Sequence, residues 1–343
     1  MIAADPVLAQ IGYAEPIWIM ILKAIVIFAV GLNLIPVVLL VERKLLGRFQ
    51  GRYGPNRVGP YGVIQPIADI LKLLTKEQFR PTTAIGTLYA VAPMISMVTA
   101  IATLAIIPFG PVVDIFGTPV GLYGLDVSIG ILYAFSFGAV AFYGLMLGGW
   151  ASGSKYSFLG SMRAAAQLIS YEVAQGMAIV GVIMTAGTLS LVGIVEHQAG
   201  MWYVVPQIVG FIVFMVASFA ETNRAPFDLT EADAELVGGY NTEYGGGRFA
   251  SYYFAEYLNV IIVSALATTL FLGGWQLPFG IDPPQWVDPF VVIGKIFLVV
   301  LFFIWIRATL PRLRYDQLMS LGWKVLLPIA TLNALVTAIL VVS

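Results

Sequence analysis

Hydrophobic residues occur in eight long runs along this chain, separated by polar segments. The runs cover residues 16–41, 84–107, 126–150, 159–187, 202–220, 250–275, 289–310 and 318–342. Each has roughly 20 residues, the length that a helix needs to cross a hydrocarbon core of ~30 Å. Strands of a membrane barrel are about half as long, so the runs indicate helices. We therefore predict an all-α polytopic membrane protein with eight transmembrane helices, forming one integral membrane domain over residues 1–343.

The segment 65–79 has a different pattern. Apolar side chains lie on one helical face (Ile67, Ile70, Leu71 and Leu74) and charged ones on another (Asp69, Lys72 and Lys76). This segment is too short to span, and it predicts an amphipathic helix in the membrane interface, within a long loop at 42–83. Two functions are open for it. An anchor to anionic lipid, which the basic residues favour, is one; a wall for ligand entry, which would explain Asp69 better, is the other.

The positive charges indicate the orientation. All but two of the 18 Lys and Arg residues lie in or beside the loops of one side, and the loops of the other side hold none. By the positive-inside rule, the charged loops face the cytoplasm or matrix, and both termini face away from it. The two exceptions, Lys23 and Lys295, lie about 10 Å inside the outer ends of their spans. We expect them to extend to the outer interface; pairing with Glu172 is the alternative.

Composition narrows the chemistry. The chain is 59% hydrophobic and 11% charged, with a net charge of −1, which gives no indication of nucleic-acid binding. It has no Cys, so it provides no thiolate ligands for a metal or an iron–sulfur cluster. One His, His197, cannot form a metal site alone, and we predict no metal site. Residues 1–15 lack a basic region, so we expect no cleavable signal peptide.

Negative charge concentrates in the segment 221–256, which includes an acidic loop at 221–249. It contains seven of the 19 acidic residues and only two basic ones. Residues 228–231 also match a capping box, so Glu231 could simply cap a short helix. A helix start needs only one or two acids, whereas this loop has four: Asp228, Glu231, Asp233 and Glu235. The excess favours a functional role over capping.

One carboxylate is predicted to lie near mid-membrane. Glu172 follows Arg163 by nine residues, a distance of about 13 Å along a helix. Gln167, Tyr171 and Gln175 repeat at four-residue spacing beside it and form a polar stripe. Charged residues at this depth are usually functional; a protonated Glu that only hydrogen-bonds a neighbouring helix is the alternative. Three more carboxylates approach from the charged side: Glu42 ends the first span, Glu221 ends the fifth, and Glu256 lies one or two turns into the sixth.

These segments resemble a known family. GRFQGRYGPNRVGPYGVIQPIADILKLLTKE, RAAAQLISYE, AETNRAPFDLTEADAELVGGYNTEY and LPRLRYDQLMSLGWKVLLP are similar, in this order, to the H subunit of respiratory complex I, the NADH dehydrogenase subunit 1 family. The resemblance extends from Glu42 to Pro328. It implies an eight-helix subunit at the base of the membrane arm that docks the quinone-binding peripheral arm.

The resemblance also implies roles for individual positions. The proton or coupling path would include Glu42, Asp69, Glu172, Glu221, Asp228, Glu231, Asp233, Glu235 and Glu256. The wall of the quinone tunnel would include Arg43, Phe49, Gln50, Arg52, Arg57, Phe227 and Arg307. Asp233 stands where many members of the family have Glu, so its carboxylate reaches less far.

The implied function is that of a membrane subunit of a proton-pumping NADH:quinone oxidoreductase with quinone as substrate. FMN and iron–sulfur clusters would be bound by partner subunits. The expected partners are other complex I subunits, namely the quinone-site subunits of the peripheral arm and small membrane-arm subunits, together with membrane lipid. We expect the bacterial plasma membrane as the location, or else the mitochondrial inner membrane. Alternatives are the homologous subunit of a membrane-bound hydrogenase or ferredoxin-driven complex, a stand-alone proton or cation transporter, and a purely structural anchor.

Overall fold

Membrane-length helices dominate the computed structural model, which describes residues 15–115, 117–230, 233–278 and 284–342. Seven helical segments in this part of the chain are long and apolar enough to span a membrane: α2 (Ile17–Phe49), α4 (Gly86–Leu104), α5 (Gly130–Ala151), α6 (Lys155–Ala186), α10 (Gly246–Phe271), α11 (Asp288–Thr309) and the continuous segment Tyr315–Val342. The predicted all-α membrane fold is confirmed.

The fifth predicted span is shorter than expected. Helix α8 (Ile208–Glu221) has 14 residues, about 21 Å, because the chain forms turns before Gln207 and the helix starts six residues later than predicted. The last span consists of α12 (Tyr315–Leu321), a π-helical turn, η4 (Gly322–Leu326), and α13 (Leu327–Val342). The π turn precedes Pro328, which has no N–H to donate to the preceding helical turn.

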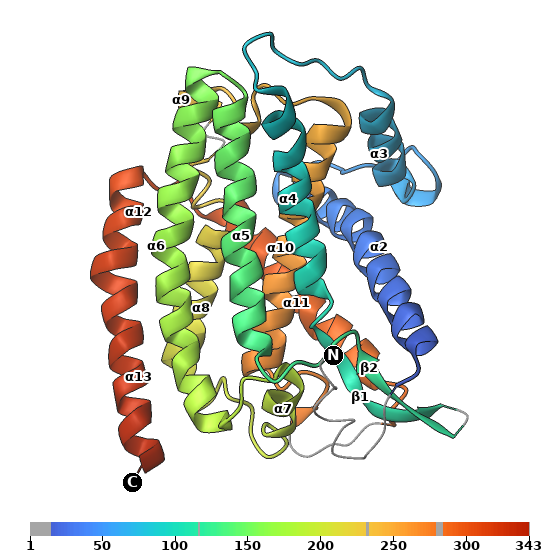
Figure 1. The fold of residues 1–343 in the computed structure, drawn as a ribbon, viewed down its shortest axis with the longest axis vertical. Helices are drawn as coiled ribbons and strands as arrows, with labels where there is room; N and C mark the ends of the chain where they lie inside the picture. The colour runs from blue at the N-terminus through green and yellow to red at the C-terminus, as the bar shows by residue number, and fades with distance from the viewer. Residues whose placement is uncertain (1–14, 116, 231–232, 279–283, 343) are drawn as a thin grey trace.

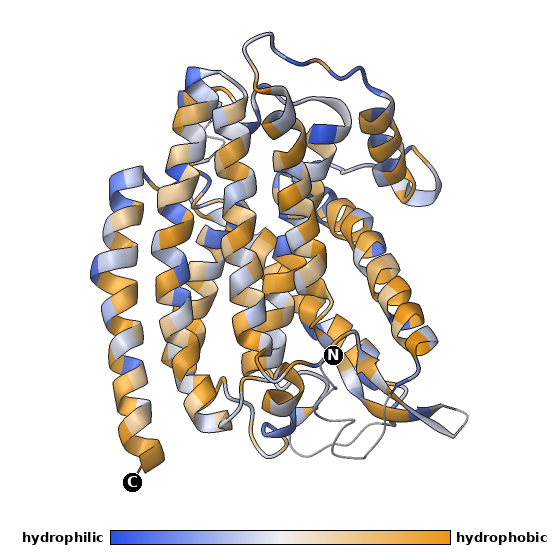
Figure 2. Ribbon diagram, in the orientation of Figure 1, coloured by the Kyte–Doolittle hydropathy of each residue, from blue (hydrophilic) through white to orange (hydrophobic). Residues whose placement is uncertain are grey.

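The helices run back and forth between two ends of the molecule (Figure 1). The end that carries α3 (Gln65–Thr75) and α9 (Asp233–Leu236) also carries the basic loops, and we call it the charged end. Figure 2 shows hydrophilic residues concentrated around α3 and the adjoining loops, with hydrophobic residues along the helices below. Two short turns, η1 (Pro60–Gly62) and η2 (Gly239–Asn241), belong to the loops of this end.

Helix α2 continues past the predicted end of the first span. It extends to Phe49, eight residues beyond Val41, because the segment contains no helix breaker before Gly51, whose φ of 66° ends the helix. Glu42 and Arg43 are therefore helical residues rather than loop residues. The amphipathic helix α3 is shorter than the predicted 65–79 and ends at Thr75.

The opposite end carries the short helix α7 (Leu191–Glu196) and a β-hairpin that the apolar runs did not predict. Strand β1 (Pro108–Ile115) pairs antiparallel with β2 (Thr118–Tyr123), with Val113 opposite Val120. The hairpin lies beside the start of α2 (Figure 1). The Glu15 carboxylate connects the two: it accepts from the Lys23 ammonium at 2.7 Å and from the Gly121 amide at 3.4 Å.

Helix α10 forms the centre of the bundle. Every residue from Val260 to Phe271 is buried, as expected for a helix that is apolar on all sides. It packs against α4 and α11, and it also contacts α2, α3 and α8. By contrast, α2 and α13 expose long apolar faces and lie at the rim. Polar residues on α10 are therefore held inside protein rather than at the lipid surface.

One prediction about an individual residue was wrong. Lys295 does not extend to the outer interface: its ammonium donates to the carbonyl oxygens of Leu272, Gly274 and Gln276 at 2.7, 2.8 and 2.5 Å. These acceptors follow the C-terminal end of α10, where carbonyls have no intrahelical partner. The capping box at 228–231 stays a prediction, because Glu231 lies outside the part of the chain that the structure describes.

Candidate functional site

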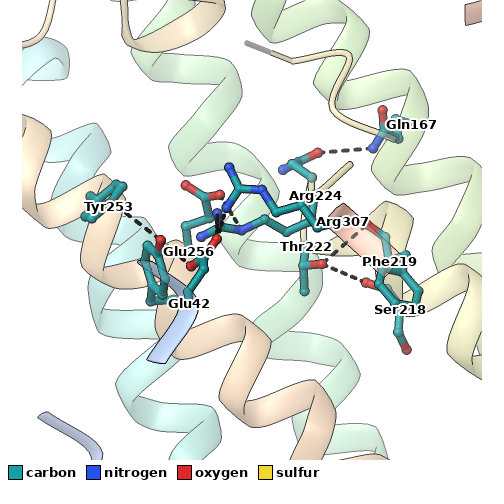
Figure 3. A network of polar contacts seen from close by, with 11 residues as sticks. Glu42, Gln167, Ser218, Phe219, Thr222, Arg224, Tyr253, Glu256 and Arg307 are labelled. Atoms are coloured by element: carbon teal, nitrogen blue, oxygen red, sulfur yellow. Dashed lines mark hydrogen bonds and ion pairs between the residues drawn. The ribbon is translucent and has the colours of Figure 1, made fainter. Parts of the chain in front are cut away.

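A buried arginine joins carboxylates from two helices. Arg224 lies just after α8, and its Nε is 2.9 Å from Oε1 of Glu256 on α10. Its Nη1 is 3.8 Å from Oε1 of Glu42 on α2. Figure 3 shows these side chains converging between the helices. One cation therefore links residues that are more than 200 positions apart in sequence.

Other groups complete this cluster. Arg307, on α11, forms an ion pair with Oε1 of Glu42. The Tyr257 hydroxyl donates to Oε2 of Glu42 at 2.7 Å, and its ring lies 4.3 Å from the Arg224 guanidinium. The Tyr253 hydroxyl donates in turn to that of Tyr257 at 3.2 Å. Each Glu42 oxygen thus has a donor, which a carboxylate removed from water requires.

Burial makes this cluster sensitive to charge. Glu42 is only 5% exposed and Arg224 8%. Burial by itself lowers the pKa of Arg224, but the carboxylates of Glu256 and Glu42 and the hydroxyl of Tyr257 outweigh it and hold the pKa well above its usual value. Arg224 is therefore a fixed positive charge that the two carboxylates share.

A polar cavity continues the cluster toward α5. It has a volume of about 80 Å³ and is lined by Glu256 on one side and Glu221, the last residue of α8, on another. Hydroxyl groups of α4 and the amide of Asn259 also line it: the α4 residues are Ser96, Thr99 and Thr103. A water molecule needs about 10–15 Å³ of such volume and two or more polar partners, so the cavity is large and polar enough for several waters.

Glu172 extends the line onto α6. The Glu221 carboxyl interacts with the side chain of Gln175 and with the charge of Glu172. The predicted polar stripe has partners in the protein: Gln167 donates to the carbonyl oxygens of Ala220 and Phe227, and Tyr171 to that of Leu318. These bonds fix α6 against the acidic loop and α12. Glu172 itself is partly buried.

The line also continues toward α3. Arg43, next to Glu42 on α2, forms an ion pair with Asp69 of the amphipathic helix. The Gln65 amide donates to the same carboxylate at 3.0 Å. Charged residues and one polar cavity therefore follow one another across the charged half of the molecule, with Arg43 and Glu42 as sequence neighbours on α2. In order, this series contains Asp69, Arg43, Glu42, Arg224, Glu256, the cavity, Glu221 and Glu172; we call it the carboxylate line.

The acidic loop lies beside this line, and an ion pair further along the loop also ties it to α6. Glu235 accepts a hydrogen bond of 2.6 Å from Arg163 and lies 3.8 Å from Arg312. The hydrogen bond from Arg163 lowers the pKa of Glu235 below its usual value. Asp228 is partly buried in the turn before α9. Glu231 and the side chain of Asp233 lie outside the described part of the chain.

The predicted quinone-tunnel residues fall into three groups. Phe49, Arg52 and Arg57 are exposed at the charged end, where Gln50 accepts a hydrogen bond from Arg52. Arg43 and Arg307 belong to the charged cluster instead. Phe227 is apart from both groups: it is buried against Tyr171, with ring centroids 5.7 Å apart, and lines an apolar cavity of about 230 Å³ between α8 and α11.

Several members of this site were missed by sequence reasoning. Arg224, Tyr253, Tyr257 and Asn259 were not among the predicted residues. The spacing on α10 offered a signal, since Tyr253, Glu256 and Tyr257 share a helical face at i, i+3 and i+4. Within the described residues, no group of three or more His, Asp or Glu side chains could hold a metal ion.

Known proteins of one family are similar to this chain over most of its length. A profile of the family described as NADH dehydrogenase matches residues 22–338. The chain is 49% identical to the first H subunit of NADH-quinone oxidoreductase in Geobacter metallireducens over 316 residues, 92% of this chain and 94% of the relative. It is 50% identical to the second H subunit of NADH-quinone oxidoreductase in Geobacter sulfurreducens, with the same coverage.

A third relative, the H subunit of NADH-quinone oxidoreductase in Frankia alni, is 47% identical over 97% of this chain and 75% of its own length. Identity at this level over nearly the full length shows common descent rather than a shared architecture alone. The chain therefore belongs to the NADH dehydrogenase family as an H subunit of NADH-quinone oxidoreductase, a membrane subunit of respiratory complex I.

Proposed function

We propose that this subunit forms part of the quinone-binding tunnel at its charged end and that its carboxylate line couples quinone reduction to proton movement in the membrane arm. The observation that carries the proposal is the succession of charged groups, linked by ion pairs and a polar cavity, between Asp69 on α3 and Glu172 on α6. Charged groups inside a membrane domain are costly and are retained mainly where function needs them.

Arg224 is the pivot of the proposed coupling. Its guanidinium lies closer to Glu256 than to Glu42: the shortest N–O distances are 2.9 Å to Glu256 and 3.8 Å to Glu42. Quinone reduction consumes protons and changes the electric field at the charged end. A field change that strengthens the attraction of Arg224 to Glu42 weakens its contact with Glu256. A desolvated carboxylate that loses its cation is neutralised by taking up a proton, and the polar cavity supplies a route from Glu221.

The quinone wall would be completed by partner subunits. Phe49, Arg52 and Arg57 are exposed on this chain, and an aromatic ring with flanking guanidinium groups suits an apolar quinone head that carries two carbonyl oxygens. The peripheral-arm subunits at the quinone site and small membrane-arm subunits are the proposed partners. FMN and iron–sulfur clusters would be held by other subunits of the complex, because this chain has no Cys to ligate a cluster.

The relatives favour this function over the alternatives. All three are named as NADH-quinone oxidoreductase subunits, which favours this complex over a hydrogenase or a ferredoxin-driven complex. The similarity to H subunits of NADH-quinone oxidoreductase extends over nearly the whole chain, which is not expected of a stand-alone transporter. The buried carboxylates are not expected of a purely structural anchor. The three relatives are bacterial, which favours the bacterial plasma membrane over the mitochondrial inner membrane.

One experiment separates the two halves of the proposal. In membranes that contain the assembled complex, Phe49→Ala should raise the KM for quinone roughly five- to thirty-fold, the effect of losing about 1–2 kcal/mol of contact, with protons pumped per electron pair unchanged. Glu221→Gln should lower pumping without raising that KM. Trp286→Ala, which removes an exposed aromatic ring at the opposite end, is the control. An unchanged KM in Phe49→Ala would contradict the proposed quinone tunnel. Unchanged pumping in Glu221→Gln would contradict the proposed proton path.

A further inference from the structure

A large apolar groove lies at the opposite end of the molecule, away from the carboxylate line. Its volume is about 330 Å³, the largest of the described cavities. It is formed where α2, the β-hairpin and α11 meet. Its lining comes from α2 (Leu22, Lys23, Val26, Ile27 and Val30), from the hairpin (Phe109 and residues 120–123) and from α11 (Pro289 and Ile293).

The groove lies at the depth of lipid tails and opens toward them. Leu22 is five residues into α2 and Val30 thirteen, so the lining extends from about 7 to about 20 Å along the helix from its outer start. Leu22 is 53% exposed and Val26 50% exposed, so the open side of the groove is at the membrane-facing surface of α2. The medium at this depth is hydrocarbon.

Water is a poor occupant for this groove. Lys23 is the one charged residue in the lining, and its ammonium is 2.7 Å from the Glu15 carboxylate and 5.1 Å from the centre of the Tyr123 ring. The other side chains that line the groove are aliphatic or aromatic. An apolar cavity of about 150 Å³ already stays dry and binds benzene in another protein, and this groove is larger.

The charges around the groove select the headgroup. Lys23 is neutralised by Glu15, and Lys295 is held by three carbonyl groups. All other Lys and Arg residues belong to segments at the charged end. Exposed acids at this end include Asp114 and Glu196. An anionic headgroup would therefore meet repulsion without a free cation, whereas a zwitterionic one presents an ammonium group to the acids.

We infer that this groove binds one acyl chain of a zwitterionic phospholipid, in the leaflet at the opposite end from the quinone site. The lipid fills the space that the hairpin opens and holds α2, the hairpin and α11 together. This site is independent of the carboxylate line, so its test does not depend on the proposed function.

The test uses the intact complex reconstituted in nanodiscs that contain phosphatidylethanolamine and phosphatidylglycerol, then re-extracted in mild detergent. Val26→Trp fills the groove; Val98→Trp, at a residue of α4 that is 60% exposed and does not line the groove, is the matched control. Mass spectrometry of retained lipid should find one phosphatidylethanolamine fewer in Val26→Trp than in the wild type and in Val98→Trp. Equal retention in all three, or loss of phosphatidylglycerol instead, would overturn the inference.

A second measurement decides the question if Val26→Trp does not assemble. A photoreactive benzoylphenylalanine at Leu22 should form an adduct with phosphatidylethanolamine in the wild-type background. An adduct with quinone, with a neighbouring subunit or with the N-terminal segment of this chain would show a different occupant and would contradict the inference.

Discussion

Removing the positive charge of Arg224 is expected to destabilise the subunit strongly. The guanidinium is buried and contacts two carboxylates, Glu256 at 2.9 Å and Glu42 at 3.8 Å. Breaking a buried ion pair by deleting one partner typically costs about 3–5 kcal/mol, because the remaining charge is left without compensation. Glu42 keeps Arg307, so the loss falls mainly on Glu256. We expect a cost near the lower end, about 3 kcal/mol, for Arg224→Met.

The same reasoning predicts a rescue. Arg224→Met with Glu256→Gln removes both charges, and replacing both members of a buried pair is often close to neutral. The double variant should therefore recover most of the lost stability. Arg224→Lys should lie between the two, because an ammonium keeps the charge but not the planar set of donors.

The assay is the apparent Tm of the purified complex, together with the yield of assembled complex. Arg314→Met is the matched control, because Arg314 pairs with Asp316 on the surface, where such pairs are worth about 0–1 kcal/mol. Arg224→Met should lower the apparent Tm by several degrees, and Arg314→Met should not change it measurably. Equal Tm values for these two variants, or no recovery in the double variant, would show that the buried pair contributes no more than a surface pair.

Two further predictions concern the orientation of the chain and the acidic loop. Single Cys residues introduced at Val237 and Gln285, in this Cys-free chain, should react with a membrane-impermeant reagent from the cytoplasmic face and from the outer face respectively; the reverse pattern would overturn the orientation. The Glu235–Arg163 ion pair should hold the acidic loop at neutral pH. Because the pKa of Glu235 is lowered in the folded protein, this contribution is complete above the usual range of a Glu carboxyl and is lost as the pH falls through the lowered value. A fluorophore attached at Val237→Cys should lose anisotropy over that acidic range. In Glu235→Gln, the same fluorophore should already have low anisotropy at neutral pH. Equal anisotropy with and without Glu235→Gln at neutral pH would rule the pair out as an anchor.

The sequence predicted the spans well because hydrophobic length is a local property. It missed the hairpin at 108–123, since a short apolar connection between two spans has no length signal of its own. The prediction that Lys295 extends to the outer interface rested only on its depth in the span. The unpaired carbonyls after α10 that bind this lysine become neighbours only when α10 and α11 pack together.

The site was predictable in part. Glu42, Glu221 and Glu256 could be picked out because each is a carboxylate at the end of an apolar run, where charge is costly. Arg224 was passed over because basic residues are common in loops of that side. Its position between Glu42 and Glu256 depends on contacts across more than 200 residues, which no local pattern contains.

The most direct test of the carboxylate line is proton pumping per electron pair in membranes carrying Glu172→Gln. Glutamine keeps the size and hydrogen-bonding capacity of a protonated Glu but cannot release a proton. Glu196→Gln, at the opposite end on α7, is the control. If Glu172 is a relay, its variant should assemble normally and lose most of its coupled turnover, while Glu196→Gln pumps like the wild type. Normal assembly with unchanged pumping in Glu172→Gln would show that this carboxylate is only a packing group and would contradict the proposed relay.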